Sequence, residues 1–427
     1  MPMSETHDII VVGGGPAGLM AAIESSRNGA RVLVFESGPK PGRKLLATGG
    51  GRCNLTRSDE VGAFLEGFDT RAARFLKHAV YGFTPADACE WFESHGIPLK
   101  TERGGRVFPV SDRSGDVLGA LLADTRSRGV GFRLRAPVRS ITIDGAVFSV
   151  EADGGPYRSN ALILATGGIS MRRTGSTGDG FRFAESLGHI VTPLRPSLVP
   201  LVTGDTWPGD IAGLSLKNVT LTARPAGKRV QRFGEMLFTH HGIGGPIVLE
   251  ISRFVTDVLH SGDGPVPAEI DLKPALDDRQ LDARLLREIE RGPKRALGAI
   301  LDTLMPRSLA GVFASGFGFD ASQPVSHLTR GERIRLRMLL KALPLTITGT
   351  GPVEDALVTR GGVRLDEISP KTLESRIVPG LFFAGEVMDI DGDCGGYNLH
   401  MCWATGRLAG RSAANVRNEV KPHESKA

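Results

Sequence analysis

Asp8-Ile9-Ile10-Val11-Val12-Gly13-Gly14-Gly15-Pro16-Ala17-Gly18 is the stretch that decides the fold. Its apolar run predicts a strand buried on both faces of a parallel sheet. Gly13-x-Gly15-x-x-Gly18 is the dinucleotide fingerprint: its glycines permit a tight turn, backbone approach to a pyrophosphate, and close packing of the next helix. We expect that helix to point its free N–H groups and positive dipole end at the phosphates.

The next strand, residues 31–36, ends in an acid, Glu36, which is placed to accept hydrogen bonds from adenosine ribose hydroxyls. An acid here disfavours a 2′-phosphate, so the site fits FAD or NAD rather than NADP. The plainer interpretation is an ordinary strand, turn and helix with a solvent-facing glutamate. The complete pattern of strand, turn, helix and acid favours cofactor binding.

Two later strands also end in glycines. Residues 161–165 run into Thr166-Gly167-Gly168, and residues 381–384 run into Gly385-Glu386. Open α/β sheets bind ligands at this carboxyl edge. Both strand ends are typical of two-domain flavoproteins, which favours FAD and places an acid beside the ribityl chain. A glutamate stands where an aspartate is usual, which leaves three candidates for that contact: Glu386, Asp389 and Asp391.

A basic, glycine-rich loop spans residues 42–54. Such a loop can fold over a pyrophosphate while Arg43 or Lys44 neutralises charge. The alternative is a mobile surface loop with incidental basic residues. Cys53 could lie near the flavin ring, although a packed thiol is the commoner outcome.

The middle of the chain has a different pattern of apolar and polar residues. Residues 197–272 carry short alternating segments, which predict an antiparallel or barrel-like unit. Residues 277–343 are periodic and charged, which predicts three or four short helices. We therefore predict an α/β fold, a Rossmann-like FAD-binding domain interrupted by an inserted β-barrel-like subdomain and a small helical subdomain. The expected segments are 1–194 and 345–427 for the FAD-binding domain, 195–275 for the barrel and 276–344 for the helices.

Composition narrows the function less than the motifs do. The net charge of +5 and the pI of about 9.1 suit an anionic cofactor or substrate, and also RNA. None of the four cysteines forms a C-x-x-C pair, so we expect reduced thiols, neither a redox dithiol nor a cysteine zinc site. No apolar run reaches the length of a membrane span, and we expect a cytoplasmic protein.

Three segments carry a specific resemblance to a known family: residues 42–57, Leu237 to Pro246, and Gly385 to Asn398. In order, and with the insert included, the chain resembles the YhiN/BaiN-like bacterial FAD-dependent oxidoreductases over nearly its whole length. The resemblance implies FAD held by the 13–18 turn, the 42–54 loop and the 385–398 run. It also implies NAD(P)H-linked reduction of a carbon–carbon double bond in a steroid-like enone.

A broader resemblance concerns the region of the flavin ring. Residues 359–363, 379–386 and 175–180 are similar to the corresponding stretches of fumarate reductase-type flavoproteins. Those enzymes bind their dicarboxylate with a histidine four positions before a Gly-Gly pair, where this chain has Leu357. We therefore expect a substrate other than fumarate.

The C-terminal helix, expected from Leu399 to Val416, is opened by Gly395-Gly396-Tyr397-Asn398. Its N–H groups would then face the flavin pyrimidine edge, where reduced flavin carries negative charge. The candidate cofactor-binding residues are Gly13, Gly15, Pro16, Ala17, Gly18, Glu36, Ser37, Arg43, Lys44, Thr48, Gly49, Gly51, Arg52, Cys53, Asn54, Ala165, Thr166, Gly167, Gly385, Glu386, Asp391, Gly396, Tyr397, Asn398 and Leu399.

Thr239 and His240 are the tentative catalytic residues, because a histidine could protonate a substrate carbon opposite the incoming hydride. A turn that merely packs the insert, with its histidines bonded to backbone, is weighed equally. His240 and His241 are adjacent and point apart, so we expect no metal site.

The leading hypothesis is a flavin-dependent reductase acting on a small molecule, with NAD(P)H as a transient electron donor. No second GxGxxG is present, so NAD(P)H would visit the same face as the substrate. An RNA-modifying flavoprotein is one alternative, but we interpret the basic helix at 330–341 as a solvated face and disfavour nucleic acid. A non-catalytic flavin sensor is the other. The sequence leaves the oligomeric state open.

Overall fold

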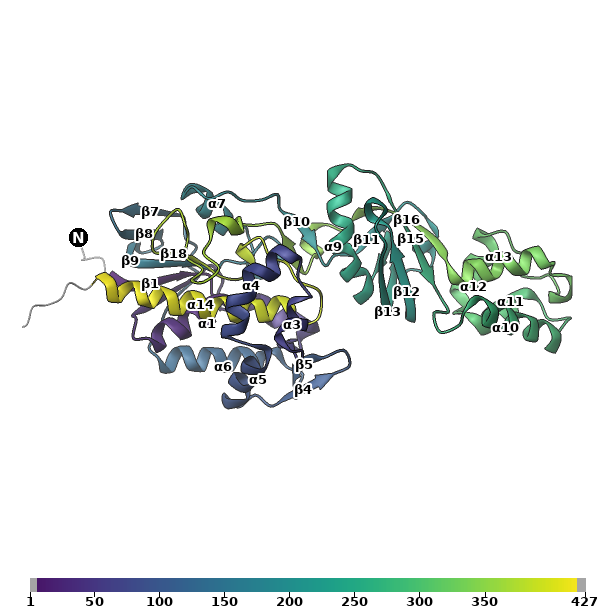
Figure 1. The fold of residues 1–427 in the computed structure, drawn as a ribbon, viewed down its shortest axis with the longest axis horizontal. Helices are drawn as coiled ribbons and strands as arrows, with labels where there is room; N and C mark the ends of the chain where they lie inside the picture. The colour runs from purple at the N-terminus through teal and green to yellow at the C-terminus, as the bar shows by residue number, and fades with distance from the viewer. Residues whose placement is uncertain (1–5, 421–427) are drawn as a thin grey trace, which may run out of the picture. The chain divides into compact units, whose positions relative to one another are not determined.

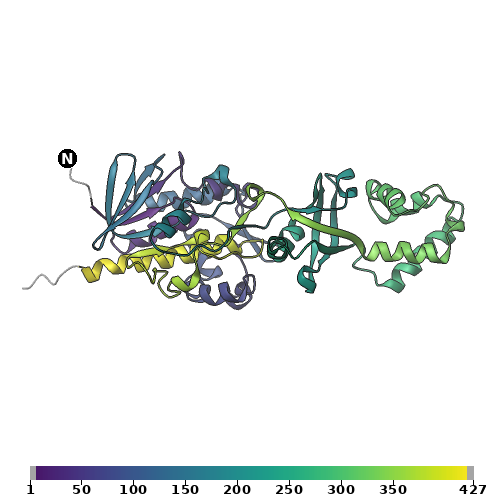
Figure 2. The same cartoon turned by 90° about the horizontal axis from the view of Figure 1, so that it is seen from above.

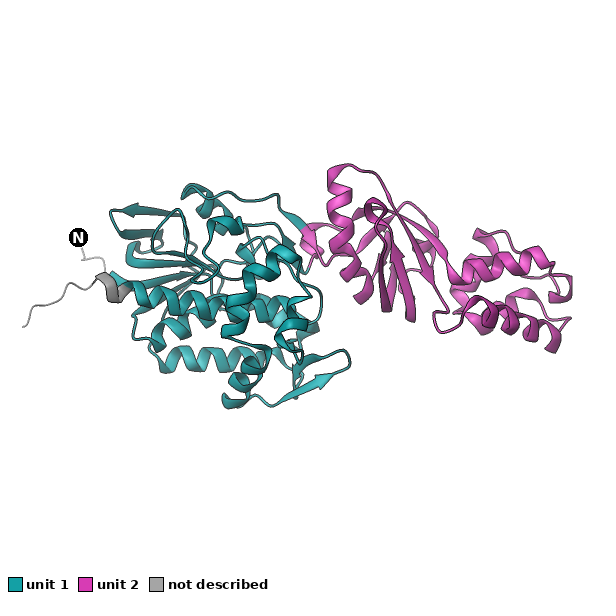
Figure 3. Cartoon of the chain, viewed as in Figure 1, with its two compact units in different colours: residues 1–195, 357–427 teal, residues 196–356 magenta. Residues whose placement is uncertain are grey.

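The computed structural model describes residues 6–420, and the side chains as far as residue 416. These residues form two compact units (Figure 3). Unit 1 holds the residues up to Arg195 and those from Leu357 onward, and unit 2 is Pro196–Ala356. The chain therefore leaves the first unit and returns to it, so the second unit is an insert.

Unit 1 is built on a seven-stranded sheet with the order β6-β2-β1-β9-β8-β7, in which β18 also pairs with β9 (Figure 1). Strands β6, β2, β1, β9 and β18 are parallel, and the β7-β8-β9 part is antiparallel. Strands β2 and β18 and the later halves of β1 and β9 are buried, which explains their unbroken apolar runs. The strands are β1 (Thr6–Val12), β2 (Val32–Glu36), β6 (Gly131–Leu134), β7 (Ser140–Asp144), β8 (Val147–Ala152), β9 (Gly155–Leu164) and β18 (Leu381–Phe383).

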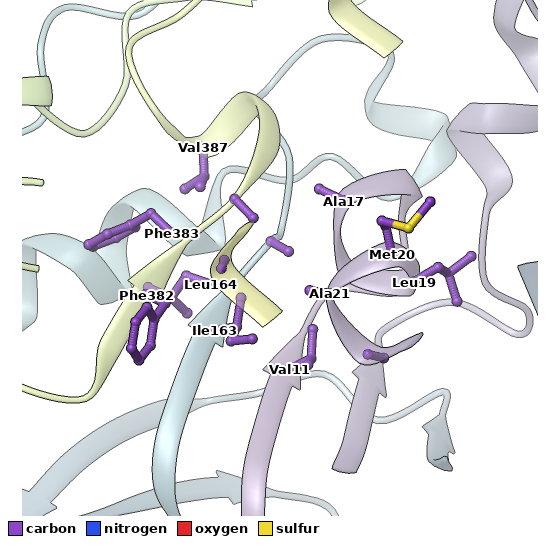
Figure 4. Close-up of a cluster of buried hydrophobic side chains, with 14 of the residues drawn as sticks. Val11, Ala17, Leu19, Met20, Ala21, Ile163, Leu164, Phe382, Phe383 and Val387 are labelled. Carbon is purple, nitrogen blue, oxygen red and sulfur yellow. The ribbon is translucent and has the colours of Figure 1, made fainter. Parts of the chain in front are cut away.

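Helices α1 (Pro16–Arg27) and α14 (Tyr397–Val420) pack against each other and against this sheet. They approach closely: a Cβ on Gly406 would lie 2.4 Å from the Ala17 carbonyl oxygen. Side chains from α1, β1, β9 and β18 meet in the core (Figure 4), and Figure 2 shows α14 in yellow running along the sheet. The first and last elements of the chain are thereby joined in one core.

Most of the remaining elements of unit 1 contribute further side chains to this core. A three-stranded antiparallel sheet of order β3-β5-β4 is among the remaining elements. They are α2 (Arg43–Ala47), η1 (Thr48–Gly51), β3 (Thr56–Arg57), α3 (Val61–Leu65), α4 (Thr70–Gly82), α5 (Pro85–Ser94), β4 (Leu99–Glu102), β5 (Arg106–Pro109), α6 (Ser114–Ser127), η2 (Arg172–Thr174), α7 (Asp179–Ser186), β17 (Val358–Arg360), η6 (Leu365–Glu367) and η7 (Gly385–Val387).

Unit 2 contains a closed antiparallel barrel of order β11-β14-β13-β12-β15-β16. Alternating residues of its strands fill the interior, including Leu221, Phe238, Ile270 and Ile347. The barrel strands are β11 (Leu201–Thr203), β12 (Ser215–Ala223), β13 (Val230–Thr239), β14 (Gly242–Gly244), β15 (Val266–Asp271) and β16 (Leu343–Thr350), with β10 (Arg195–Ser197) preceding them. Helices α8 (Trp207–Asp210) and α9 (Pro246–Ser261) and the short turns η3 (Pro225–Gly227) and η5 (Val353–Asp355) complete this part.

Four helices are inserted between β15 and β16, and they share the apolar core of unit 2 with the barrel. They are α10 (Asp278–Arg291), α11 (Leu297–Leu304), α12 (Arg307–Gly316) and α13 (Arg330–Lys341), with η4 (Val325–His327) among them. The expected fold class, a Rossmann-type domain with a barrel and a helical insert, is confirmed.

The boundary near residue 345 differs from the sequence expectation. Strand β16 pairs with both β15 and β11 and closes the barrel, so unit 1 resumes only at Leu357. Without β16 both neighbouring strands would keep an open edge. Of the helices in residues 6–420, none is long and apolar enough to cross a membrane.

Candidate functional site

Three strand ends of unit 1 lie side by side at the carboxyl edge of the sheet. Val12 of β1 and Phe383 of β18 both pair with Leu164 of β9. The turns at 13–18, 165–168 and 384–387 therefore begin next to one another. The sequence expected ligand binding at this edge, where parallel α/β sheets bind ligands. Ala165 is buried there, and Thr166 and Gly167 are half-buried.

The 13–18 turn has one crowded side and one open side. A Cβ on Gly18 would lie 1.9 Å from the Gly13 carbonyl oxygen, so only glycine fits between strand and helix. A Cβ on Gly15 would meet no protein atom within 4 Å. Helix α1 begins after Gly15, at Pro16 and Ala17, without a side-chain cap. Its first N–H groups are left for an anionic ligand.

Glu36 is buried at the end of β2, and its carboxylate accepts hydrogen bonds from the turn at 13–18 and from the segment that follows β2. Its Oε2 accepts a hydrogen bond from the Gly14 N–H at 3.1 Å, and its Oε1 accepts one from the Gly38 N–H at 2.7 Å. Each carboxylate oxygen can accept a second hydrogen bond. Arg43 lies beside this acid, close to Gly38, and donates to the Arg173 carbonyl. Ser37 is exposed next to them.

Arg52 has a different environment from the one the sequence suggested for the basic loop. Its guanidinium donates to Glu102 at 2.8 Å and to Asp112 at 3.4 Å. It also lies over the Phe108 ring, 4.1 Å from the centroid. Its charge is therefore compensated within the protein.

The end of the loop is buried. Burial raises the pKa of the Cys53 thiol to about 12, against a smaller opposing effect of Thr48. A neutral, buried thiol is a poor nucleophile, which agrees with a packing role. The neighbouring Asn54 has a buried Oδ1 with no hydrogen-bond partner among the described residues, and it lies where a Cβ on Gly396 would approach to 3.0 Å.

Lys44 and Glu386 form a largely buried ion pair that joins four distant segments. The Lys44 Nζ lies 2.7 Å from Glu386 Oε2 and donates to Ser170 Oγ at 2.8 Å. Ser170 Oγ lies 2.9 Å from Glu386 Oε1, which also accepts from the Thr359 N–H at 2.8 Å. The Lys44 and Glu386 side chains are only 19% and 11% exposed.

Burial alone would raise the pKa of Glu386, but Lys44 and the Thr359 hydrogen bonds outweigh it and hold the pKa below its ordinary value. The carboxylate is therefore ionised at neutral pH. Ser170 and Thr359 were not predicted as site residues. The available signal was their position beside the Gly-Gly pairs at 167–168 and 361–362.

The other two acids of the 385–398 run have partners of their own. Asp391 is buried and pairs with Arg360 at 2.8 Å. Asp389 pairs with Arg71, although burial dominates and raises the pKa of Asp389. Of the three candidates for a ribityl contact, Glu386 is the one that directly follows the end of a parallel strand, since β18 pairs with β9 and runs into Gly385 and Glu386.

The turn before α14 is held by side chains as well as by glycines. Asn398 Oδ1 accepts from the Gly392 N–H at 2.7 Å, and its Nδ2 donates to the Gly392 carbonyl at 2.9 Å. A ligand here would contact the backbone of Asn398, because the side-chain amide of Asn398 is already hydrogen-bonded within the turn. Arg57 lies over the Tyr397 ring, 4.7 Å from the centroid, and Leu399 is buried.

His400 is fully buried one turn into α14. Its Nδ1 lies 3.0 Å from Thr56 Oγ1, and its Nε2 lies 3.0 Å from the Phe83 carbonyl. The carbonyl requires a donor, so Nε2 carries the proton and Nδ1 accepts from the threonine. Burial lowers the pKa of His400 to about 4, against a smaller effect of the Phe83 carbonyl. The imidazole is therefore neutral at physiological pH.

The two tentative catalytic residues lie in unit 2. Thr239 ends β13 and is half-buried, and His240 is exposed in the turn to β14. The neighbouring His241 carbonyl accepts from the Thr203 N–H at 3.0 Å, which ties this turn to β11. The turn thus has a structural role through its backbone and leaves the His240 side chain exposed. Among the side chains that the structure describes, residues 6–416, no cluster could hold a metal ion.

Comparison with known proteins gives matches over nearly the whole chain. The family described as HI0933-like protein Rossmann domain matches residues 7–412. A 3-dehydro-bile acid delta(4,6)-reductase of Clostridium scindens is 34% identical over 409 residues, covering 95% of this chain and 98% of that protein. A ribosomal RNA dihydrouridine synthase of Escherichia coli is 32% identical over 405 residues, covering 94% and 96%.

Solved structures of low sequence identity share the fold. A quinol–fumarate reductase with menaquinol molecules has a TM-score of 0.52 at 18% identity, covering 98% of this chain and 73% of that one. A 3-ketosteroid delta1-dehydrogenase from Sterolibacterium denitrificans has a TM-score of 0.50 at 14% identity, covering 96% and 99%. These two comparisons bear on the architecture alone.

Proposed function

The chain belongs to the HI0933-like (YhiN/BaiN) family of flavoprotein oxidoreductases, and on that premise we propose that it binds FAD and reduces a carbon–carbon double bond conjugated to a carbonyl group. The observation that carries the proposal is the pair of relatives. One is named for reducing a 3-dehydro-bile acid and the other for making dihydrouridine in ribosomal RNA. These substrates differ in size and charge, but both names describe hydrogen added across such a bond.

The residues at the sheet edge fit FAD. The uncapped start of α1 offers N–H groups to a pyrophosphate, and the open space at Gly15 leaves room for it. Glu36 would accept from the adenosine ribose hydroxyls, and the unpartnered Asn54 Oδ1 needs a donor, which a flavin N–H can provide. When bound, FAD supplies the hydride chemistry.

The protein's own groups would position the cofactor and control charge. The Lys44–Glu386 pair places a fixed cation and anion beside the end of β18. The N-terminus of α14, opened by Gly396, would stabilise negative charge on a reduced flavin. His240 or Thr239 would supply a proton to the substrate carbon, a role that rests on residue type and on the exposure of His240.

We propose NADH or NADPH as the electron donor and a cytoplasmic location, as expected from the sequence. Without a second dinucleotide fingerprint, the nicotinamide would alternate with the substrate at one face of the flavin. Leu357 stands where fumarate reductase-type proteins carry a histidine, so a dicarboxylate substrate is disfavoured.

Uridine in ribosomal RNA is the second candidate substrate. It would take precedence over a small-molecule enone if the protein binds RNA. It is favoured by relatives in Escherichia coli and Haemophilus influenzae that are 32% and 31% identical over 94% of the chain. The C5–C6 double bond of uracil is conjugated to a carbonyl, so both candidates need the same reaction. This proposal revises the sequence expectation that nucleic acid is disfavoured.

Anaerobic reduction of the purified yellow protein tests the proposal. NADH and NADPH are added in turn, and the flavin absorbance is followed. The reduced protein is then reoxidised with a panel of cyclic enones, quinones, fumarate and uridine-containing RNA. We expect one nicotinamide to bleach the flavin and an enone or the RNA, but not fumarate, to restore it. Failure of both nicotinamides to bleach the flavin would refute the reductase.

A further inference from the structure

The positive charge of the chain is concentrated in the helical part of unit 2. Residues 273–341 contain thirteen lysines and arginines and eight acids, a net charge of +5, which equals the net charge of the whole chain. The rest of the protein is therefore neutral overall. A concentrated charge of this kind indicates a polyanionic partner when its cations are free and share a face.

Helix α13 is a weaker candidate for such a face, because Arg333, Arg337 and Lys341 are in ion pairs within unit 2. Arg333 lies 3.4 Å from Asp282, and Lys341 lies 2.6 Å from Asp271. Arg335 donates to the Phe317 carbonyl. These contacts agree with the interpretation from the sequence that this helix does not bind RNA.

Helix α10 does provide one. Arg284, Arg287 and Arg291 follow one another at spacings of three and four residues, which places them on one side of the helix. That side is distinct from the buried one, which carries Leu281 and Leu285. Within the described part of the chain, Arg284 and Arg287 form no ion pair.

The third arginine and the residues after the helix extend this face. Arg291 forms a long ion pair with Glu288, at 3.9 Å, and 73% of its side chain is exposed, so the pair is weak and the guanidinium stays accessible. Lys294 follows, exposed and without an ion pair in residues 6–420. Lys273 is half-buried, and burial first and then the charge of Arg284 lower its pKa. The charge of Arg284 thus acts on Lys273, which places Lys273 near the arginines of α10.

We propose that this basic face, formed by Lys273, Arg284, Arg287, Arg291 and Lys294, binds the phosphate backbone of RNA. Arg284, Arg287 and Lys294 form no ion pair among the described residues, and each phosphate contact gains from the release of counterions. Arginine suits phosphate because its fork donates two hydrogen bonds. The inference rests on the proposed function in its second form, in which the reduced double bond belongs to a uridine in RNA.

The test uses short fluorescein-labelled fragments of protein-free Escherichia coli ribosomal RNA, with binding followed by anisotropy in the absence of NAD(P)H. The variant is Arg287→Gln/Arg291→Gln/Lys294→Gln in the full-length FAD-loaded protein. The matched control is Arg74→Gln/Lys77→Gln/Arg126→Gln, which removes three exposed cations of unit 1 that form no ion pair among the described residues.

We expect the α10 variant to bind RNA at least about tenfold more weakly near physiological salt, and its slope of log K against log salt to fall by about 2 to 3. The control should bind with nearly the wild-type slope. Equal slopes in all three proteins, or no RNA binding by the wild type, would overturn the inference. Bleaching of the flavin by NAD(P)H is measured in the same samples and is expected to be unchanged. If NAD(P)H does not bleach the flavin but the α10 variant alone binds RNA more weakly, the proposed reductase activity is refuted and the basic face is still supported.

Discussion

The Lys44–Glu386 pair allows a prediction that can be worked through in numbers. In Lys44→Met the Glu386 carboxylate loses the cation 2.7 Å away and stays buried, with an exposed side-chain fraction of 11%. Removing one partner of a buried pair costs roughly 3–5 kcal/mol of unfolding free energy. Ser170 Oγ and the Thr359 N–H still face the carboxylate, so we expect the lower end, about 3 kcal/mol.

The double variant Lys44→Met/Glu386→Gln separates this charge effect from lost packing. It leaves no uncompensated charge, so its stability should return to within about 1 kcal/mol of the wild type. The control Lys40→Met removes a nearby exposed lysine and should change stability by less than about 0.5 kcal/mol. Urea unfolding of the FAD-free proteins measures all of these, because Lys44 is also a proposed cofactor contact and bound FAD would add its own stabilisation.

The pH dependence adds a second readout. In the wild type the pKa of Glu386 is held below its ordinary value, so its contribution to stability is present above the unfolded pKa and is lost as the pH falls through the folded one. Without Lys44, burial dominates and raises the folded pKa. The deficit of Lys44→Met should therefore be larger near pH 8 than near pH 5, where the carboxyl takes up a proton. Equal deficits in the single and double variants, independent of pH, would refute the reasoning.

Three further predictions concern His400, the helix pair and the fingerprint turn. The pKa of His400 is depressed from 6.5 to about 4, so its contribution to stability is present above pH 6.5 and is lost as the pH falls toward 4. The loss should reach about 2 kcal/mol at pH 5. A His400→Gln variant should therefore show a flatter pH profile of the unfolding free energy in urea. Gly410→Ala would place a Cβ 2.3 Å from the Ala21 carbonyl oxygen and should lower stability by roughly 1–3 kcal/mol, whereas Gly311→Ala, in open space on a helix, should be neutral or stabilising in the same thermal-melt series. Gly15→Ala meets no protein atom within 4 Å, so the FAD-free variant should melt like the wild type while calorimetric titration shows FAD bound at least about tenfold more weakly; unchanged affinity would mean that the pyrophosphate does not lie there.

Much of unit 1 could be predicted from the sequence, because the signals are local. Buried parallel strands need unbroken apolar runs, and the strand-to-helix crossing at Gly18 admits no side chain. The same holds for the barrel and the helices of the insert, whose periods of two and of three to four residues differ along the chain. The family could also be identified in this way, and the comparisons confirm it.

Only the tertiary structure decided how the site's charges are arranged. Lys44 and Glu386 lie 342 positions apart. The Gly-Gly pairs beside Ser170 and Thr359 mark these two residues as near a strand end, but not as partners of that ion pair. Arg52 is one of the candidate cofactor-binding residues of the basic loop, and only the fold shows that the β4–β5 hairpin brings Glu102 to its guanidinium. Local sequence determines which backbone shapes are sterically allowed and which faces are apolar. Which charges are compensated depends on contacts between residues far apart in the sequence. The opening glycines specify the Rossmann fold, but they do not determine those contacts.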